Sequence, residues 1–218
     1  MLKSTIERLA CGLISSAMIA TNNNIDMAIN KANSRTVLDS TIDERDKRYD
    51  QYIDQIAYCI DTTSSYKTHI EAVSLANDIE RALVDLEADY NYKKDIPKVL
   101  AMMSAETDFR NLSANEAEAV GYMQITPECL EYMNKKMGWD YTMDDMNDPE
   151  ANIKVGWAKL NLDMDKLSED EAIVAYNQGY RNLKGAVIAS WEDSHSYLSK
   201  IINREEKYSK MMGELKYD

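Results

Sequence analysis

Apolar residues recur at helical spacing through the first half of the chain. One series lies within residues 43–60 and a second within residues 66–90. Steps of three and four residues place side chains on one face of a helix, so the pattern predicts two amphipathic helices. The intervening DTTSS, residues 61–65, is interpreted as the turn, with Ser or Thr available as an N-cap. The two series are Tyr49, Tyr52, Ile53, Ile56, Ala57 and Ile60, then Leu75, Ile79, Leu83, Leu86 and Tyr90.

The pattern changes at residues 95–109, DIPKVLAMMSAETDF. Asp95 can cap a helix and Pro97 suits its first turn. Residues 99–103 are apolar on every side, which is typical of a buried helix rather than of a surface helix. We therefore expect a core helix that ends close to Glu106.

Further start and stop signals follow along the second half. The sequence predicts a helix from about Pro127 to Gly138, one after the turn at Asp148, and one from Ser168 to Gly179, followed by one or two closing helices. The chain has three prolines and seven glycines in 218 residues and no long alternating strands. We therefore expect an all-α fold, with at most a minimal β element.

Composition excludes several classes of partner. The net charge of −13 is spread along the chain without a basic stripe, so neither nucleic acid nor an anionic membrane surface is an expected partner. Three separated cysteines (Cys11, Cys59 and Cys129) form no disulfide or zinc pattern, and they are interpreted as small hydrophobes. With two isolated histidines, we expect no metal and no cofactor. Methionines such as Met102, Met103, Met123 and Met133 are interpreted as core filling.

The N-terminal segment LACGLISSAMIA, residues 9–20, is apolar and follows Lys3 and Arg8. It is too short to span a membrane. Its length suits the apolar region of a signal peptide, but Glu7 and the pair Ser15 and Ser16 interrupt the pattern. An amphipathic first helix and a weak export signal both remain open, and the signal is not convincing.

Glu106 is the residue whose setting points to chemistry. It follows apolar turns and falls near a helix C-terminus, where desolvation and the negative end of the helix dipole both favour the protonated carboxyl. A carboxylic acid that stays protonated near neutral pH can donate a proton to a glycosidic oxygen. Taken alone, a Glu at a helix end is more often a solvated surface residue.

Four blocks in the second half resemble the soluble (SLT) type of lytic transglycosylase, a lysozyme-like family. ETDF at 106–109 and GYMQITP at 121–127 are similar to the family's E-S-x-F and G-L-M-Q-I-x-P, with the same separation. DPEANIKVGWAKL at 148–160 and AIVAYNQG at 172–179 are similar to its third and fourth blocks, and SYLSKI at 196–201 to its closing Y-V-x-x-V. The resemblance covers residues 95–202 and does not reach residues 1–90.

The resemblance implies a lysozyme-like catalytic domain over residues 93–218, with an added N-terminal helical region over residues 1–92. It implies that Glu106 is the catalytic acid and that Gly121 keeps side chains out of the sugar groove. Within the same family picture, Asn152 is interpreted as a turn residue and Gly156 as a close-packing site. The implied substrate-binding residues are Asn115, Gly121, Tyr122, Gln124, Tyr176 and Asn177, with the Tyr176 phenol near the acid.

The implied reaction is cleavage of the β-1,4 bond between N-acetylmuramic acid and N-acetylglucosamine by one Glu, which leaves 1,6-anhydromuramoyl ends. Two positions depart from the family pattern, because Asn115 replaces a serine and Glu118 replaces a loop glycine. Asn115 can still hydrogen-bond an N-acetyl group. Glu118 is a candidate second carboxylate for ordinary hydrolysis, although a solvated loop charge is the simpler interpretation.

Two alternatives to the transglycosylase stay open. One is a hydrolytic muramidase (a lysozyme or endolysin) on the same fold, and the other is a non-catalytic wall-binding or virion structural module. We expect a monomer that acts on peptidoglycan glycan strands at the bacterial cell wall, either as a phage lysis or virion protein or within bacterial machinery. The N-terminal helices could dock a partner, but packing beside the catalytic unit is the favoured interpretation.

Overall fold

The computed structural model describes residues 47–114, 117–179 and 191–214. The predicted N-terminal segment at 9–20, Cys11 and Asn115 lie outside the described residues. Residues Gln51–Asp218 form one compact unit, which contains the helices on both sides of residue 92. The predicted division between residues 92 and 93 therefore does not coincide with a break in packing, and it stays a prediction.

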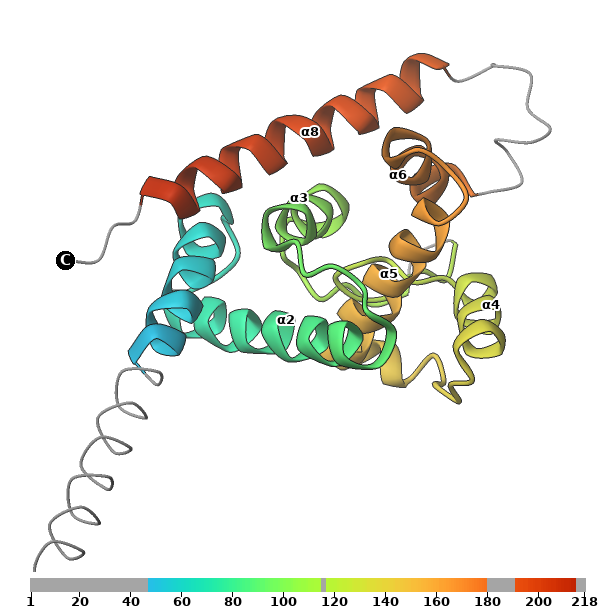
Figure 1. The fold of residues 1–218 in the computed structure, drawn as a ribbon, viewed down its shortest axis with the longest axis horizontal. Coiled ribbons are helices and arrows are strands. Elements are labelled where there is room, and N and C mark those ends of the chain that lie inside the picture. The colour runs from blue at the N-terminus through green and yellow to red at the C-terminus, as the bar shows by residue number, and fades with distance from the viewer. Residues whose placement is uncertain (1–46, 115–116, 180–190, 215–218) are drawn as a thin grey trace, which may run out of the picture. The chain divides into compact units, whose positions relative to one another are not determined.

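The unit is built from helices, as predicted (Figure 1). Residues 51–63 are helical, and an isolated antiparallel bridge joins Val120 to Ile125. The other elements are α2 (His69–Tyr90), α3 (Ile96–Thr107), α4 (Pro127–Met137), the short 3-10 helix η1 (Asp145–Asn147), α5 (Pro149–Met164), α6 (Glu169–Gln178) and α8 (Trp191–Glu214).

Helix α3 lies in the middle of the unit, with α8 on one side and α2 on the other (Figure 1). Residues 99–103 are 0% exposed, which confirms the predicted core helix. The side chain of Asp95 caps its first turn. Met102, Met103, Met123 and Met133 are all fully buried, so the methionines do fill the core.

The first turn was predicted three residues too early. The helix that contains residues 51–60 continues to residue 63, and the N-cap of α2 is Thr68. Thr68 and Glu71 form a reciprocal capping box, with the Thr68 amide bonded to Oε2 of Glu71 at 2.9 Å. That local pair, which satisfies two amides at once, outweighs the weaker capping residues of DTTSS.

The second half follows its predicted signals closely. Helix α4 has a proline in its first turn and ends at Gly138, whose φ is +72°. Ser168 and Glu171 form the capping box of α6, and Gly179 is its C-cap. Cys59 is buried and Cys129 half-buried, as interpreted, and both thiols are free. The fold therefore follows from local signals wherever those signals are strong.

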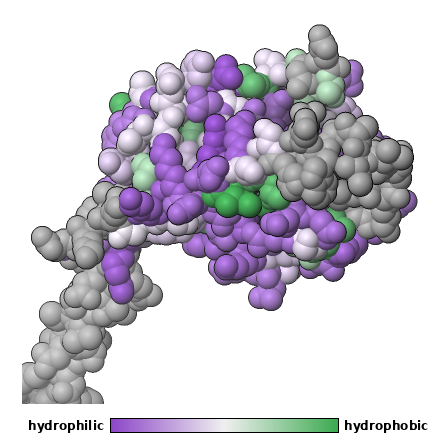
Figure 2. Space-filling model, turned by 90° about the horizontal axis from the view of Figure 1, so that it is seen from above, coloured by the Kyte–Doolittle hydropathy of each residue, from purple (hydrophilic) through white to green (hydrophobic). Residues whose placement is uncertain are grey.

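Helix α2 packs on α5, and α8 packs on both α3 and α6. Figure 2 views the face on the α8 side, where hydrophilic side chains surround a small hydrophobic strip. No helix within residues 47–114, 117–179 and 191–214 has the length and apolar character needed to cross a bilayer. The arrangement places the C-terminal end of α3 beneath α8, and the candidate site is built there.

Candidate active site

Glu106 is the second-last residue of α3. The chain turns sharply after it, because Asp108 and Phe109 both adopt left-handed backbone conformations, with φ of +53° and +58°. The Phe109 ring is fully buried and packs edge-on against Tyr208 of α8, with 6.2 Å between ring centroids. The turn is thus fixed by packing, and Glu106 is held at the end of a rigid core helix, as predicted.

Tyr197 is the direct partner of Glu106. Its hydroxyl donates a hydrogen bond of 2.5 Å to Oε1 of Glu106. Two more side chains of α8 bond the same end of α3: Lys200 Nζ donates to the Ala105 carbonyl at 2.8 Å, and Arg204 donates to Ser104 Oγ at 2.6 Å. Helix α8 therefore aligns a phenol, an ammonium and a guanidinium along the last turn of α3.

The pKa of Glu106 is raised above its ordinary value of 4.5. Burial is the largest cause, because the carboxylate is poorly solvated beneath α8. The hydrogen bond from Tyr197 and the positive charge of Lys200 both act in the opposite direction, but they do not cancel the effect of burial. Burial and the Glu106 charge also raise the pKa of Tyr197, so the phenol stays a donor. The site thus favours a protonated acid.

The loop after α3 is held by a buried amide. Asn152 is 0% exposed, and its Nδ2 donates to the carbonyls of Val120 at 2.9 Å and Met146 at 3.1 Å, while its Oδ1 accepts from the Met123 amide at 2.8 Å. Asn152 lies in the first turns of α5, so its interpretation as a turn residue was wrong. A helix side chain that satisfies three backbone groups of the loop sets the position of the loop.

Gly121 is required by this packing. Its φ is +81°, and a Cβ there would lie 2.1 Å from Nδ2 of Asn152. The expectation that the glycine keeps a side chain out of the groove needs correction, because the space it leaves is filled by Asn152. Gly156 is a close-packing site as predicted, since a Cβ would lie 2.6 Å from Cβ of Met123.

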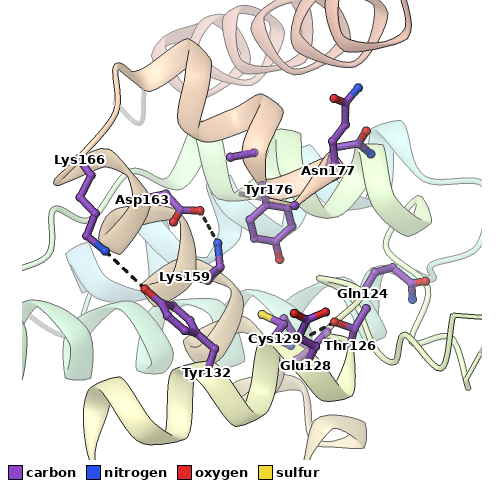
Figure 3. Close-up of a pocket in the computed structure, with 14 residues that line it drawn as sticks. Gln124, Thr126, Glu128, Cys129, Tyr132, Lys159, Asp163, Lys166, Tyr176 and Asn177 are labelled. Carbon is purple, nitrogen blue, oxygen red and sulfur yellow. Dashed lines mark hydrogen bonds and ion pairs between the residues drawn. The ribbon is translucent and has the colours of Figure 1, made fainter. Parts of the chain in front are cut away.

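Three residues assigned to substrate binding line one pocket of about 660 Å³ between α4, α5 and α6: Gln124, Tyr176 and Asn177 (Figure 3). Gln124 Nε2 donates to the Gly121 carbonyl at 2.9 Å, and Tyr176 donates to the Met123 carbonyl at 2.8 Å. The Tyr176 phenol, which we expected near Glu106, is thus bonded to the backbone of the loop. Glu106 is not part of the pocket wall, but its charge contributes to the raised pKa of Tyr176, so Tyr176 lies within electrostatic reach of the acid.

Two other assigned residues lie elsewhere. Tyr122 is 5% exposed and belongs to the hydrophobic core, and its hydroxyl accepts a hydrogen bond from Lys67 Nζ, just before α2, at 3.1 Å. Glu118 is exposed and has a φ of +57°, a conformation that explains why a glycine suits this position in the family pattern. Neither residue joins Gln124, Tyr176 and Asn177 in the pocket wall.

Sequence reasoning missed Tyr197, although SYLSKI belongs to the resemblance and Tyr197, Ile201 and Tyr208 share a helical face. It also missed the far wall of the pocket, where Tyr132, Lys159, Asp163 and Lys166 lie (Figure 3). Among the described residues, no group of three or more His, Cys, Asp or Glu side chains is placed to hold a metal ion.

A helical, lysozyme-like fold thus carries a buried carboxyl of raised pKa at the end of a core helix, and a separate pocket wall of amides and a phenol. Comparison with protein families gives a match to the transglycosylase SLT domain over residues 85–197. The match covers more than half of the chain, and the chain belongs to this family.

Two solved structures share the fold. A lytic transglycosylase Slt from Pseudomonas aeruginosa, crystallised as an inactive mutant, matches with a TM-score of 0.51 and 19% identity over 66% of this chain and 28% of that chain. The 70 kDa soluble lytic transglycosylase of Escherichia coli matches with a TM-score of 0.53 and 18% identity over 76% of this chain and 30% of that one. This chain therefore spans less than a third of either protein. A comparison with curated proteins finds no match.

Proposed function

We propose that this chain is a peptidoglycan lytic transglycosylase in which Glu106 acts first as acid and then as base. The observation that carries the proposal is the hydrogen bond of 2.5 Å from Tyr197 to a Glu106 carboxyl whose pKa burial raises. The family match over residues 85–197 supports the same substrate class. Glu106 would protonate the oxygen between N-acetylmuramic acid and N-acetylglucosamine as the bond to C1 breaks.

The second half-reaction would use the same residue. The Glu106 carboxylate would then accept the proton of the muramoyl C6 hydroxyl, whose oxygen bonds to C1 and closes a 1,6-anhydro ring. Glu106 is protonated again at the end, so no water is consumed and no external acid is needed. Tyr197 would hold the carboxyl in place through both steps, and Lys200 would moderate the charge when the carboxylate forms.

Gln124, Tyr176 and Asn177 are proposed to bind the sugar chain. An amide can both donate to and accept from hydroxyl and N-acetyl groups, and two such amides line the pocket beside Tyr176. The bond from Tyr176 to the Met123 carbonyl suggests that its phenol mainly sets the loop, with its ring as part of the wall. Gly121 and Tyr122 are proposed to support the loop around the glycan rather than the pocket itself. Asn115, which lies outside the described residues, is proposed to hydrogen-bond an N-acetyl group.

The competing reaction is hydrolysis by a muramidase. A retaining or inverting glycosidase places a second carboxyl group roughly 5–9.5 Å from the acid. The candidate for that role, Glu118, is exposed on the loop. Of the two carboxylates that line the pocket, Asp163 is paired with Lys159 and Glu128 is exposed. A carboxylate neutralised in an ion pair is a poor nucleophile or base, so Glu118 remains the candidate that substitution tests, and we propose attack by the muramoyl hydroxyl instead.

The experiment is digestion of purified peptidoglycan by the wild-type protein, Glu106→Gln and Glu118→Gln. The Glu106→Gln change removes the titrating proton with little change in shape, so we expect the release of soluble fragments to fall at least 100-fold. Glu118→Gln is the matched control, and it should stay within about twofold of wild type. Undiminished release by Glu106→Gln would refute the catalytic assignment, and a collapse caused by Glu118→Gln would favour the muramidase.

A further inference from the structure

The pocket between α4, α5 and α6 has charged side chains that a neutral sugar does not require. Lys159, Asp163 and Lys166 lie on one side of it, on α5 or just after α5 (Figure 3). The rings of an N-acetylated glycan present hydroxyl and acetamido groups, which amides can bind without formal charge. The peptide that peptidoglycan carries on its muramoyl lactyl group is different, because it contains carboxylates.

Lys166 and Tyr132 are the pair that could recognise such a carboxylate. Lys159 is neutralised within the wall by Asp163, a carboxylate that is only 2% exposed. Lys166 is exposed, and within the described part of the chain its ammonium bonds to the Tyr132 hydroxyl at 3.4 Å rather than to a carboxylate. Lys136 of α4 lies over the Tyr132 ring, 5.9 Å from its centroid. Two ammonium groups thus converge on one phenol.

The two ends of the pocket differ in chemistry. Lys166 and Tyr132 lie at one end of the view in Figure 3, and Gln124 and Asn177 at the other. Glu128, the exposed carboxylate of the pocket, lies beside Thr126 and Cys129 and apart from Lys166. One end therefore offers neutral amides and the other a cation with a phenol, which suits a ligand with a neutral sugar and an acidic branch.

We infer that Lys166 and Tyr132 bind a carboxylate of the peptide attached to the muramoyl residue while Gln124 and Asn177 face the sugar. The inference rests on the proposed function. The Tyr132 oxygen accepts a hydrogen bond from Lys166 Nζ, so its own O–H can donate to the ligand alongside the ammonium. Two donors, one of them charged, make a short charge-assisted contact with a carboxylate.

The test is a binding measurement with the full chain carrying Glu106→Gln, so that no ligand is consumed. The probes are N-acetylmuramoyl-L-alanyl-D-glutamic acid and the same compound with its carboxylates amidated, each titrated by calorimetry. Because Lys166 is exposed, we expect the acid to bind about three- to tenfold more tightly than the amide. Lys166→Met should remove this preference, and Tyr132→Phe should reduce it.

Lys135→Met is the matched control, because Lys135 is an exposed lysine of α4 outside the pocket wall. It should keep the full preference for the acid. Equal binding of the two probes by the parent protein, or a preference that survives Lys166→Met, overturns the inference. The proposed function is judged separately, since a protein that prefers the acid through Lys166 but releases nothing from peptidoglycan supports this site and refutes only the catalytic role.

Discussion

The Tyr197 hydroxyl and the Glu106 carboxyl are joined by a hydrogen bond of 2.5 Å between residues 91 apart in the sequence. The bond stabilises the carboxylate form, whereas burial stabilises the protonated form, and burial is the larger effect on the pKa of Glu106. A group that serves first as acid and then as base needs both forms to be accessible. The opposing effects of burial and of the Tyr197 hydrogen bond on the pKa of Glu106 provide this balance.

Tyr197→Phe tests this relationship. Loss of the hydroxyl removes an influence that lowers the pKa of Glu106, so this pKa rises further. The protonated acid then persists to higher pH, and we expect the alkaline limb of the kcat/KM profile on peptidoglycan to move upwards. The carboxyl also loses its anchor, so kcat should fall about tenfold.

Tyr208→Phe is the control for that change. Tyr208 is a buried tyrosine of the same helix whose hydroxyl contacts Thr63 Oγ1, at 3.0 Å, and Ser104, and it is not among the groups that shift the pKa of Glu106. Tyr208→Phe should leave the pH profile of kcat/KM unchanged. Identical profiles for wild type and Tyr197→Phe would show that the hydrogen bond does not set the protonation of the catalytic group.

Lys200→Met should also move the alkaline limb of the kcat/KM profile to higher pH, as Tyr197→Phe does, because the Lys200 charge lowers the pKa of Glu106. Lys200 is exposed, so salt should screen its influence, and in 1 M salt the Debye length is only about 3 Å. The displacement seen in low salt should therefore shrink in 1 M salt, whereas that of Tyr197→Phe should persist. Equal salt dependence of the two displacements would contradict the assignment of a contact role to Tyr197 and a through-space role to Lys200.

Glu106→Gln should stabilise the fold in a pH-dependent way. The folded-state pKa of Glu106 is raised, so the wild-type folded state binds more protons than the unfolded state once the pH exceeds about 4.5, and its stability falls as the pH rises through the folded-state pKa. Glutamine does not ionise, so the variant does not lose stability in this way as the pH rises. Urea unfolding should give the variant about 0.5–2 kcal/mol more stability at pH 8, and little difference at pH 4. A gain of the same size at both pH values would rule out the buried charge as its cause.

Gly121→Ala should destabilise the chain by about 2–4 kcal/mol, because the added Cβ meets Asn152 and the backbone has a positive φ. Gly138→Ala is the matched control. Its φ is +72°, but a Cβ there meets nothing within 4 Å, so only the backbone cost of about 1–2 kcal/mol applies. Chemical denaturation of both variants provides the comparison, and equal losses would show that Asn152 does not fill the space beside Gly121.

The elements that the sequence predicts best are those with local signals. The Asp95 cap, the proline at the start of α4 and the Ser168 capping box each act within one helical turn, and each lies where predicted. The turn before α2 was misplaced because several Ser and Thr residues compete there, and only the reciprocal pair of Thr68 and Glu71 satisfies two amides.

The candidate site could be predicted in part. Glu106 stands out through its apolar neighbours and its helix end, which are local properties. Tyr197 does not, because its role depends on how α8 packs on α3, and no spacing rule reaches across 91 residues. The same limit explains why the contact between Gly121 and Asn152 was not predicted, since it forms only when α5 packs against the loop.

The most direct test of the central claim is mass spectrometry of the fragments that the wild-type protein releases from purified peptidoglycan. Attack by the muramoyl C6 hydroxyl predicts muropeptides with non-reducing 1,6-anhydromuramoyl ends, each lighter by one water than the hydrolysis product. Fragments with reducing muramoyl ends and no anhydro ring would contradict the account and identify the chain as a hydrolase.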